Sequence, residues 1–142
     1  MHKYLLIFFF SFVYMIGFSQ LYELKVNITN IEEIKGKARI AVFTDAEHFK
    51  KKIYPVDSAV IEIKANSLLY TFNLNKGIYA VAVYQDENND GQLNKRSLGI
   101  PTEGIGFSNF QKKKLKPPVF KESSFLLQTD TTLQIPLFYD KK

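Results

Sequence analysis

Residues 86–94 read D-E-N-N-D-G-Q-L-N and gather side-chain oxygens that could bind a hard cation. Asp86, Asn88 and Asp90 stand at alternate positions and are followed by Gly91, as in the first half of a calcium-binding loop. Ca²⁺ prefers about six to eight oxygen ligands, and alternate residues of a tightly wound loop can all point inward. We therefore expect a calcium site with these ligands: Asp86, Asn88, Asp90, the backbone carbonyl of Gln92, and Asn94.

The match to a helix–loop–helix calcium motif is incomplete. The last position of that motif needs a bidentate Glu and is Ser97 here, and the residues before Asp86 have the pattern of a strand. We expect Glu103 to supply the missing carboxylate, in a weak site with a Kd of about 10⁻⁴–10⁻³ M. The alternative is a metal-free turn, because Asp, Asn and Gly are also the preferred turn residues.

The same carboxylates raise the alternative of a hydrolase. A glycosidase needs two carboxyl groups beside the scissile bond, and Asp86, Asp90 and Glu103 could meet in the fold. Other catalytic groups are scarce, because the chain has no Cys and His48 is its only His beyond residue 19. A Ser-His-Asp triad would have to use His48, which lies on a charged helix-like segment and is better explained as a surface His. A Cys nucleophile and a common zinc site lack the residues they need. We assign no catalytic residue and no organic cofactor.

Glu103 belongs to a second unusual segment, residues 98–109, which reads L-G-I-P-T-E-G-I-G-F-S-N. Its glycines give the backbone freedom, and its polar side chains are of kinds that often carry function on loops. We expect this segment to fold beside residues 86–94 and to build one surface site with Glu103 inside it. The alternative is a structurally demanding loop in which Glu103 is solvated or caps a turn.

Short strands must position these loops, because apolar and polar residues alternate with period two along much of the chain. Residues 78–85 (IYAVAVYQ) are apolar on both faces, as in a central strand covered on both sides. Residues 45–52 predict one short helix with Asp45 as its N-cap. The expected strands are residues 24–28, 37–44, 60–65, 68–74, 78–85, 124–128 and 132–139.

Some seven short strands with regular turns predict an all-β fold, an antiparallel β-sandwich of immunoglobulin-like or prealbumin-like type. Pro136, inside the last strand, predicts an edge position or a bulge. Residues 86–118 contain no convincing strand, and an irregular connection of that length inside a compact domain is often functional.

Residues 1–19 predict a secretory signal peptide. Lys3 precedes an apolar run of about 15 residues, and Gly17 and Ser19 are the small residues expected before a cleavage site at Gln20. A retained membrane anchor is the alternative, but it needs about 20 apolar residues. We expect residues 20–142 to form a single exported domain with no transmembrane span. It would lie in the bacterial periplasm, at the outer cell surface or outside the cell.

Basic residues cluster at residues 50–52 and 112–116, and loss of Lys3 would lower the formal net charge from +5 to +4. One interpretation is weak attraction to anionic polymers or lipids of the envelope. The alternative is solubilising surface charge. We expect no nucleic-acid partner, because no nucleic-acid-binding motif accompanies these lysines.

Three segments together carry a family resemblance: G-I-Y-A-V-A-V at residues 77–83, D-E-N-N-D-G at residues 86–91, and G-I-P-T-E-G-I-G-F-S at residues 99–108. The chain closely resembles the DUF2141 family of uncharacterised bacterial secreted proteins, from about Leu24 to Tyr139. The resemblance implies an extracytoplasmic all-β protein of unknown biochemical role. It transfers no catalytic residues.

These observations favour an exported binding or structural module whose functional face is formed by residues 86–109. The expected partner is an envelope component or a small ligand. A carboxylate-based hydrolase and a purely structural envelope scaffold are the two alternatives.

Overall fold

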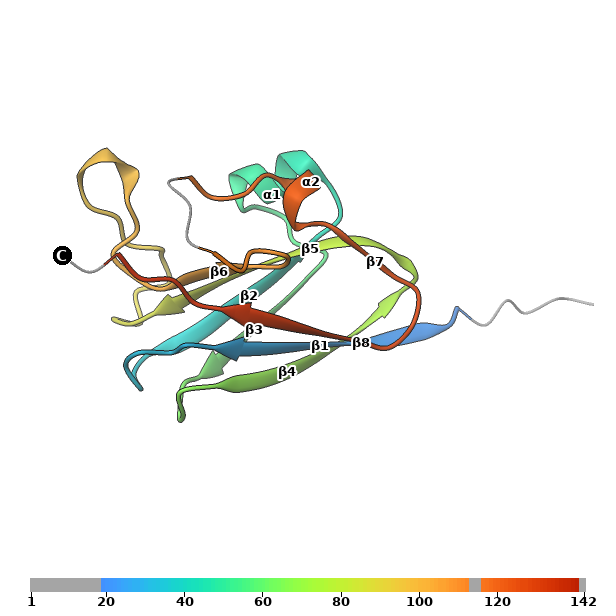
Figure 1. Ribbon diagram of the computed structural model, residues 1–142, viewed down its shortest axis with the longest axis horizontal. Helices are drawn as coiled ribbons and strands as arrows, with labels where there is room; N and C mark the ends of the chain where they lie inside the picture. The colour runs from blue at the N-terminus through green and yellow to red at the C-terminus, as the bar shows by residue number, and fades with distance from the viewer. Residues whose placement is uncertain (1–18, 113–115, 141–142) are drawn as a thin grey trace, which may run out of the picture.

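The computed structural model describes residues 19–112 and 116–140, which fold into two packed β-sheets (Figure 1). The all-β sandwich predicted from the sequence is confirmed. Its strands are β1 (Leu21–Thr29), β2 (Lys37–Phe43), β3 (Asp57–Glu62), β4 (Leu68–Asn75), β5 (Gly77–Asp86), β6 (Ile105–Phe107), β7 (Phe125–Leu127) and β8 (Thr131–Pro136). The helices are α1 (Ala46–Lys51), α2 (Phe120–Ser123) and the short 3₁₀ helix η1 (Ser97–Gly99).

The smaller sheet has the strand order β4-β1-β8. β1 pairs antiparallel with β4 but parallel with β8, so this sheet is mixed where the sequence predicted antiparallel pairing throughout. A parallel partner leaves no local mark on either strand, because the same alternation fits both directions. Pro136 ends β8 at the sheet edge, as predicted, where a missing N–H breaks no ladder bond.

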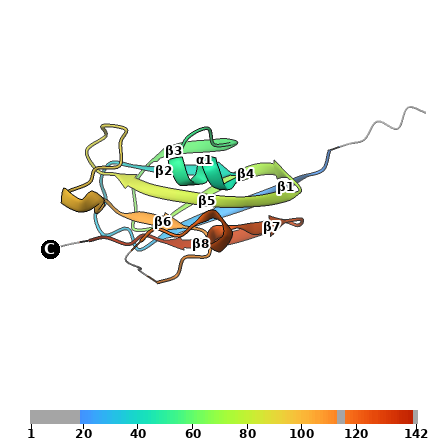
Figure 2. The same ribbon diagram turned by 90° about the horizontal axis from the view of Figure 1, so that it is seen from above.

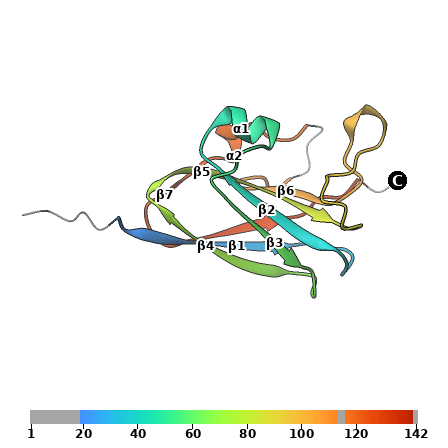
Figure 3. The ribbon, with the colours of Figure 1, turned by 180° about the vertical axis from the view of Figure 1, so that it is seen from behind.

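The larger sheet has the order β3-β2-β5-β6, and β7 pairs with the beginning of β5. Figure 3 shows β3 running beside β2 at the edge of this sheet. Side chains that alternate along the strands fill the space between the two sheets, where Leu24, Val26, Ile40, Val81 and Ile135 are almost fully buried. This alternation leaves every second residue of β2 and β5 on the opposite, outer face of the larger sheet.

The outer face of the larger sheet carries a second apolar cluster. Phe49 of α1 packs there with Ala80 and Ala82 of β5 and with Phe107 and Phe110. α1 and α2 lie next to each other on this side, where α1 contacts β2 and α2 contacts β5 (Figure 2). β5 is therefore covered on both faces, as its continuous apolar sequence predicted.

Asp45 caps α1 as predicted, since its Oδ1 accepts a hydrogen bond from the His48 N–H at 2.9 Å. The stretch expected to contain no strand, residues 86–118, holds η1 and the short strand β6, so that expectation was wrong at β6, and α2 follows just after it. Residues 1–18 of the predicted signal peptide and Lys113, Lys114 and Leu115 of the second basic cluster lie outside the described residues. Among the helices that are described, none is long and apolar enough to cross a bilayer.

Candidate functional site

Asp86 ends β5 and is fully buried, and its carboxylate is occupied by donors of the chain itself. Arg39 Nε donates to Oδ2 at 2.7 Å from the neighbouring strand β2. The backbone N–H groups of Asp90 and Gly91 donate to Oδ1 and Oδ2 at 3.1 and 3.0 Å. These hydrogen bonds fold the loop back onto the Asp86 side chain. Gly91 takes the left-handed conformation (φ 80°) that the sharp turn was expected to need.

Asp90 is the carboxylate at the centre of the loop. Its Oδ1 accepts from the Gln92 N–H at 2.8 Å, and its Oδ2 accepts from the side-chain amides of Asn88 and Asn94 at 3.0 and 2.9 Å. These hydrogen bonds, led by the one from Asn94, lower the pKa of Asp90 below its usual range. Four of the predicted ligand residues therefore converge on one point, but the amides turn their nitrogens to the carboxylate.

Glu103 is buried, with 4% of its surface exposed, and it joins two loops. Its Oε1 accepts from the Glu87 N–H and its Oε2 from the Asn94 N–H, both at 2.9 Å. The glycine-rich loop (residues 98–109) also reaches the acidic loop (residues 86–94) through Thr102, whose N–H donates to the Asn94 carbonyl at 3.0 Å. The two segments do lie side by side, and Glu103 fastens one to the other.

The described residues contain no group of three or more His, Cys, Asp and Glu placed to hold a metal ion. The predicted calcium set is of another kind, because it also uses Asn side chains and a backbone carbonyl. The calcium hypothesis therefore stays a prediction. What the contacts assign to Asp86 and Glu103 is the shaping of the loop.

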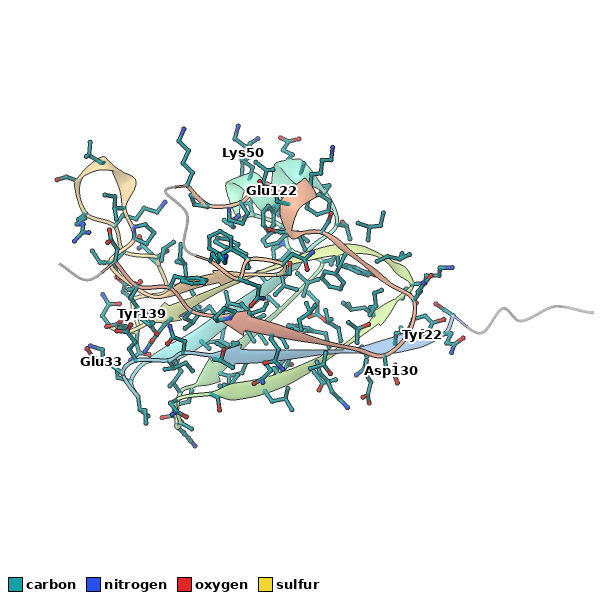
Figure 4. All side chains as sticks on the ribbon, in the orientation of Figure 1. Tyr22, Glu33, Lys50, Glu122, Asp130 and Tyr139 are labelled. Atoms are coloured by element: carbon teal, nitrogen blue, oxygen red, sulfur yellow. The ribbon has the colours of Figure 1, made fainter. Side chains whose placement is uncertain are left out.

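A network of hydrogen bonds anchors the end of β5 from which the acidic loop leaves. Gln85 is fully buried, and its Nε2 donates to the carbonyls of Glu33 and Lys35 at 2.8 and 2.9 Å. The Tyr139 hydroxyl donates to Gln85 Oε1. Figure 4 shows Glu33 and Tyr139 at this same end of the molecule. These hydrogen bonds fix the end of β5 from which the acidic loop begins.

A groove of about 270 Å³ lies beside this loop on the outer face of the larger sheet. Its floor is a cross-strand row in which Ala41 of β2 is paired with Ala82 of β5, and Ala82 with Phe107 of β6. The two alanines leave the space, because neither side chain extends past Cβ. Gly91, Gln92 and Leu93 of the acidic loop form one wall.

Each end of the groove carries a positive charge. At one end lies Arg39 of β2, whose side chain is held by Asp86. Beside it the hydroxyl of Tyr84 donates to the Gly91 carbonyl at 3.0 Å. At the other end Lys52 follows α1, and its Nζ lies 3.7 Å from the centre of the Phe49 ring. The groove is therefore apolar at its floor and cationic at its ends.

Sequence reasoning missed Arg39, Lys52 and Tyr84 as candidate site residues. The sequence patterns around these residues are common ones. Alternation puts Arg39 and Tyr84 on the outer faces of their strands, and Lys52 belongs to a basic cluster. What brings them together is the pairing of strands distant in sequence.

The chain matches the model of a known protein family. The profile of a family described as uncharacterised protein conserved in bacteria (DUF2141) matches residues 26–135, which include both loops and the groove. The chain belongs to the DUF2141 family. No curated protein and no solved structure matches this DUF2141 protein. Membership of this family therefore assigns no biochemical activity to the chain.

Proposed function

We propose that this DUF2141 protein is an exported binding module that holds a small, largely apolar ligand in the groove on the outer face of its larger sheet. The observation that carries the proposal is the apolar floor of the groove at Ala41, Ala82 and Phe107, of which Ala41 is half-buried and the other two are buried. An outward sheet face is usually polar, whereas this one carries a row of apolar residues that α1 covers only in part.

The rigidity of the groove wall supports the same proposal. Gln92 and Leu93 belong to a loop whose backbone N–H groups donate four hydrogen bonds to the carboxylates of Asp86 and Glu103. A wall fixed in this way loses little conformational freedom when a ligand binds, which lowers the entropic cost of binding. The predicted functional face at residues 86–109 is, on this proposal, one side of the groove.

Export is part of the proposal and rests on the sequence pattern of residues 1–19. The hydrolase alternative is less favoured, because the buried carboxylates of Asp86 and Glu103 accept hydrogen bonds at every oxygen. A scaffold role would leave the apolar groove without a purpose.

Calcium binding by the acidic loop is a second proposal, and one observation favours it. Asn94 Oδ1 is buried and has no hydrogen-bond partner among the described residues. A buried acceptor without a partner costs free energy that a cation could recover. The ion would take its oxygens from Asp90, Asn88 and Asn94 after the two amides turn.

The groove proposal is tested by titrating the ¹⁵N-labelled protein with 2-phenylethanol, a small uncharged aromatic probe, by NMR. We expect saturable shifts of the amides of Ala41, Ala82 and Phe107. Ala41→Leu fills the floor and should abolish these shifts. Asn73→Leu, which adds the same side chain at an exposed position of β4 in the other sheet, should leave them unchanged. Shifts that persist in Ala41→Leu would place the probe elsewhere and sink the proposal.

A further inference from the structure

The ammonium group of Lys52 lies close to three phenyl rings at one end of the groove. Its Nζ lies 3.7 Å from the centre of the Phe49 ring, 5.2 Å from that of Phe107 and 5.9 Å from that of Phe43. The three rings come from α1, β6 and β2, so they surround Lys52 only in the folded protein. Ring faces attract a cation but accept no strong hydrogen bond from it.

The hydrogen-bonding capacity of this ammonium is only partly used. Nζ has three donors, and one of them goes to the Phe49 carbonyl at the end of α1. Among the described residues, no carboxylate forms an ion pair with Lys52, whereas Lys51 beside it pairs with Glu47 at 2.6 Å. Lys52 thus offers donors and a charge toward the groove that it lines.

The backbone fixes Lys52 in this place. Lys52 closes α1 in the left-handed conformation (φ 56°), and its N–H donates to the His48 carbonyl. Non-glycine residues adopt this conformation at a cost of about 1 kcal/mol or more, so it is kept where the surroundings hold it. The bend directs the chain away from the helix while the long side chain reaches back over Phe49.

The two charged residues that line the groove, Arg39 and Lys52, are both positive. Arg39 stands at the far end, where it is paired with the buried carboxylate of Asp86 and also interacts with the charge of Asp90. Lys95 adds a further positive charge close enough to disfavour the charged form of Lys52. An anion entering the groove would therefore be attracted mainly to Lys52, whose charge has no carboxylate partner among the described residues, in an apolar setting where charge interactions are strong.

We propose that the groove binds a small organic acid, whose carboxylate accepts hydrogen bonds from the Lys52 ammonium while its apolar body lies over Ala41 and Ala82. This inference rests on the proposed function and names the ligand class. The groove, at about 270 Å³, is just below the range of about 300–1,000 Å³ typical of small-molecule sites, so the acid is small.

Two probes of nearly equal shape separate the charge from the apolar body: phenylacetate and 2-phenylethanol. At neutral pH we expect phenylacetate to bind at least about tenfold more tightly, as one charge-assisted hydrogen bond allows. Lys52→Met should weaken phenylacetate binding by about tenfold and leave 2-phenylethanol within about twofold. Lys50→Met is the matched control: it removes one charge from the same helix, at a residue that does not line this groove, and should change neither affinity.

The outcomes distinguish the two proposals. If neither probe moves the groove amides, both the groove function and the acid preference are wrong. If both bind equally, or Lys52→Met changes nothing, the acid preference alone is overturned. Equal losses in Lys50→Met and Lys52→Met would reduce the effect to general charge attraction and overturn it as well. Lys52→Arg keeps the positive charge and should retain phenylacetate binding. Unchanged 2-phenylethanol binding by Lys52→Met shows that this variant is folded.

Discussion

Glu103 is a buried carboxylate whose two oxygens accept hydrogen bonds from backbone N–H groups seven residues apart in the chain, those of Glu87 and Asn94, both at 2.9 Å. Glu103→Gln keeps the shape but turns one acceptor into a donor that faces an N–H group. A buried donor without a partner costs about 1–3 kcal/mol, so we expect unfolding free energy to fall by about 2 kcal/mol. Urea denaturation followed by circular dichroism measures this change.

The control for Glu103→Gln is Glu62→Gln on β3, where the side chain is 68% exposed and its contact with Lys64 is a surface ion pair. Such pairs contribute about 0–1 kcal/mol, so stability should hardly change. Equal effects of the two substitutions would show that Glu103 does not fasten the loops.

The charge of Lys52 predicts a pH dependence for acid binding. Burial against the phenyl rings, with the added charge of Lys95, lowers the pKa of Lys52 to about 8. The ammonium is then charged below this pH and neutral above it, while a ligand carboxylate with a pKa of about 4 stays ionised. The affinity for phenylacetate should be constant below about pH 7 and fall by about pH 9, while 2-phenylethanol shows no such change. A flat profile for phenylacetate, measured by NMR titration, would contradict the assignment.

At the scale of elements, the acidic loop combines a folding role with the calcium hypothesis. A divalent ion would have to turn the amides of Asn88 and Asn94 away from Asp90, against the nearby charge of Arg39. Binding should therefore be weak, with a Kd of about 1 mM, and about 10 mM Ca²⁺ would then add roughly 1.4 kcal/mol of stability. Scanning calorimetry with and without Ca²⁺ measures the shift, and Asp90→Asn should remove it. No shift in either protein would end the calcium interpretation.

How much of these elements the sequence predicts depends on how local their causes are. β5 and α1 were predicted correctly, because alternation and an Asp cap are properties of neighbouring residues. β6 was missed, since three residues with a glycine in the middle show no periodicity, and the strand is defined by its pairing with β5. The partners Arg39 and Asp86 are 47 positions apart, so alternation placed Arg39 outward without revealing its carboxylate.

At the scale of the whole molecule, the sandwich separates stability from binding. The interior between the sheets holds most of the large buried apolar residues, while the outer cluster around Phe49 and Phe107 borders the groove. A substitution at the groove floor therefore leaves the main core intact. This separation is what allows Ala41→Leu and Lys52→Met to be interpreted as changes in binding.

Export of the whole chain is a prediction that can be tested directly. Because β1 begins at Leu21, a cut before Gln20 would leave this strand intact. Expression of the full chain in a bacterium, followed by cell fractionation and intact-mass measurement, should give an extracytoplasmic protein that begins at Gln20. Ser19→Leu puts a bulky residue where the cleavage site needs a small one, and it should leave residues 1–19 attached. An uncleaved wild-type chain in the cytoplasmic fraction would show that residues 1–19 are not a signal peptide, and the ligand would then have to be sought inside the cell.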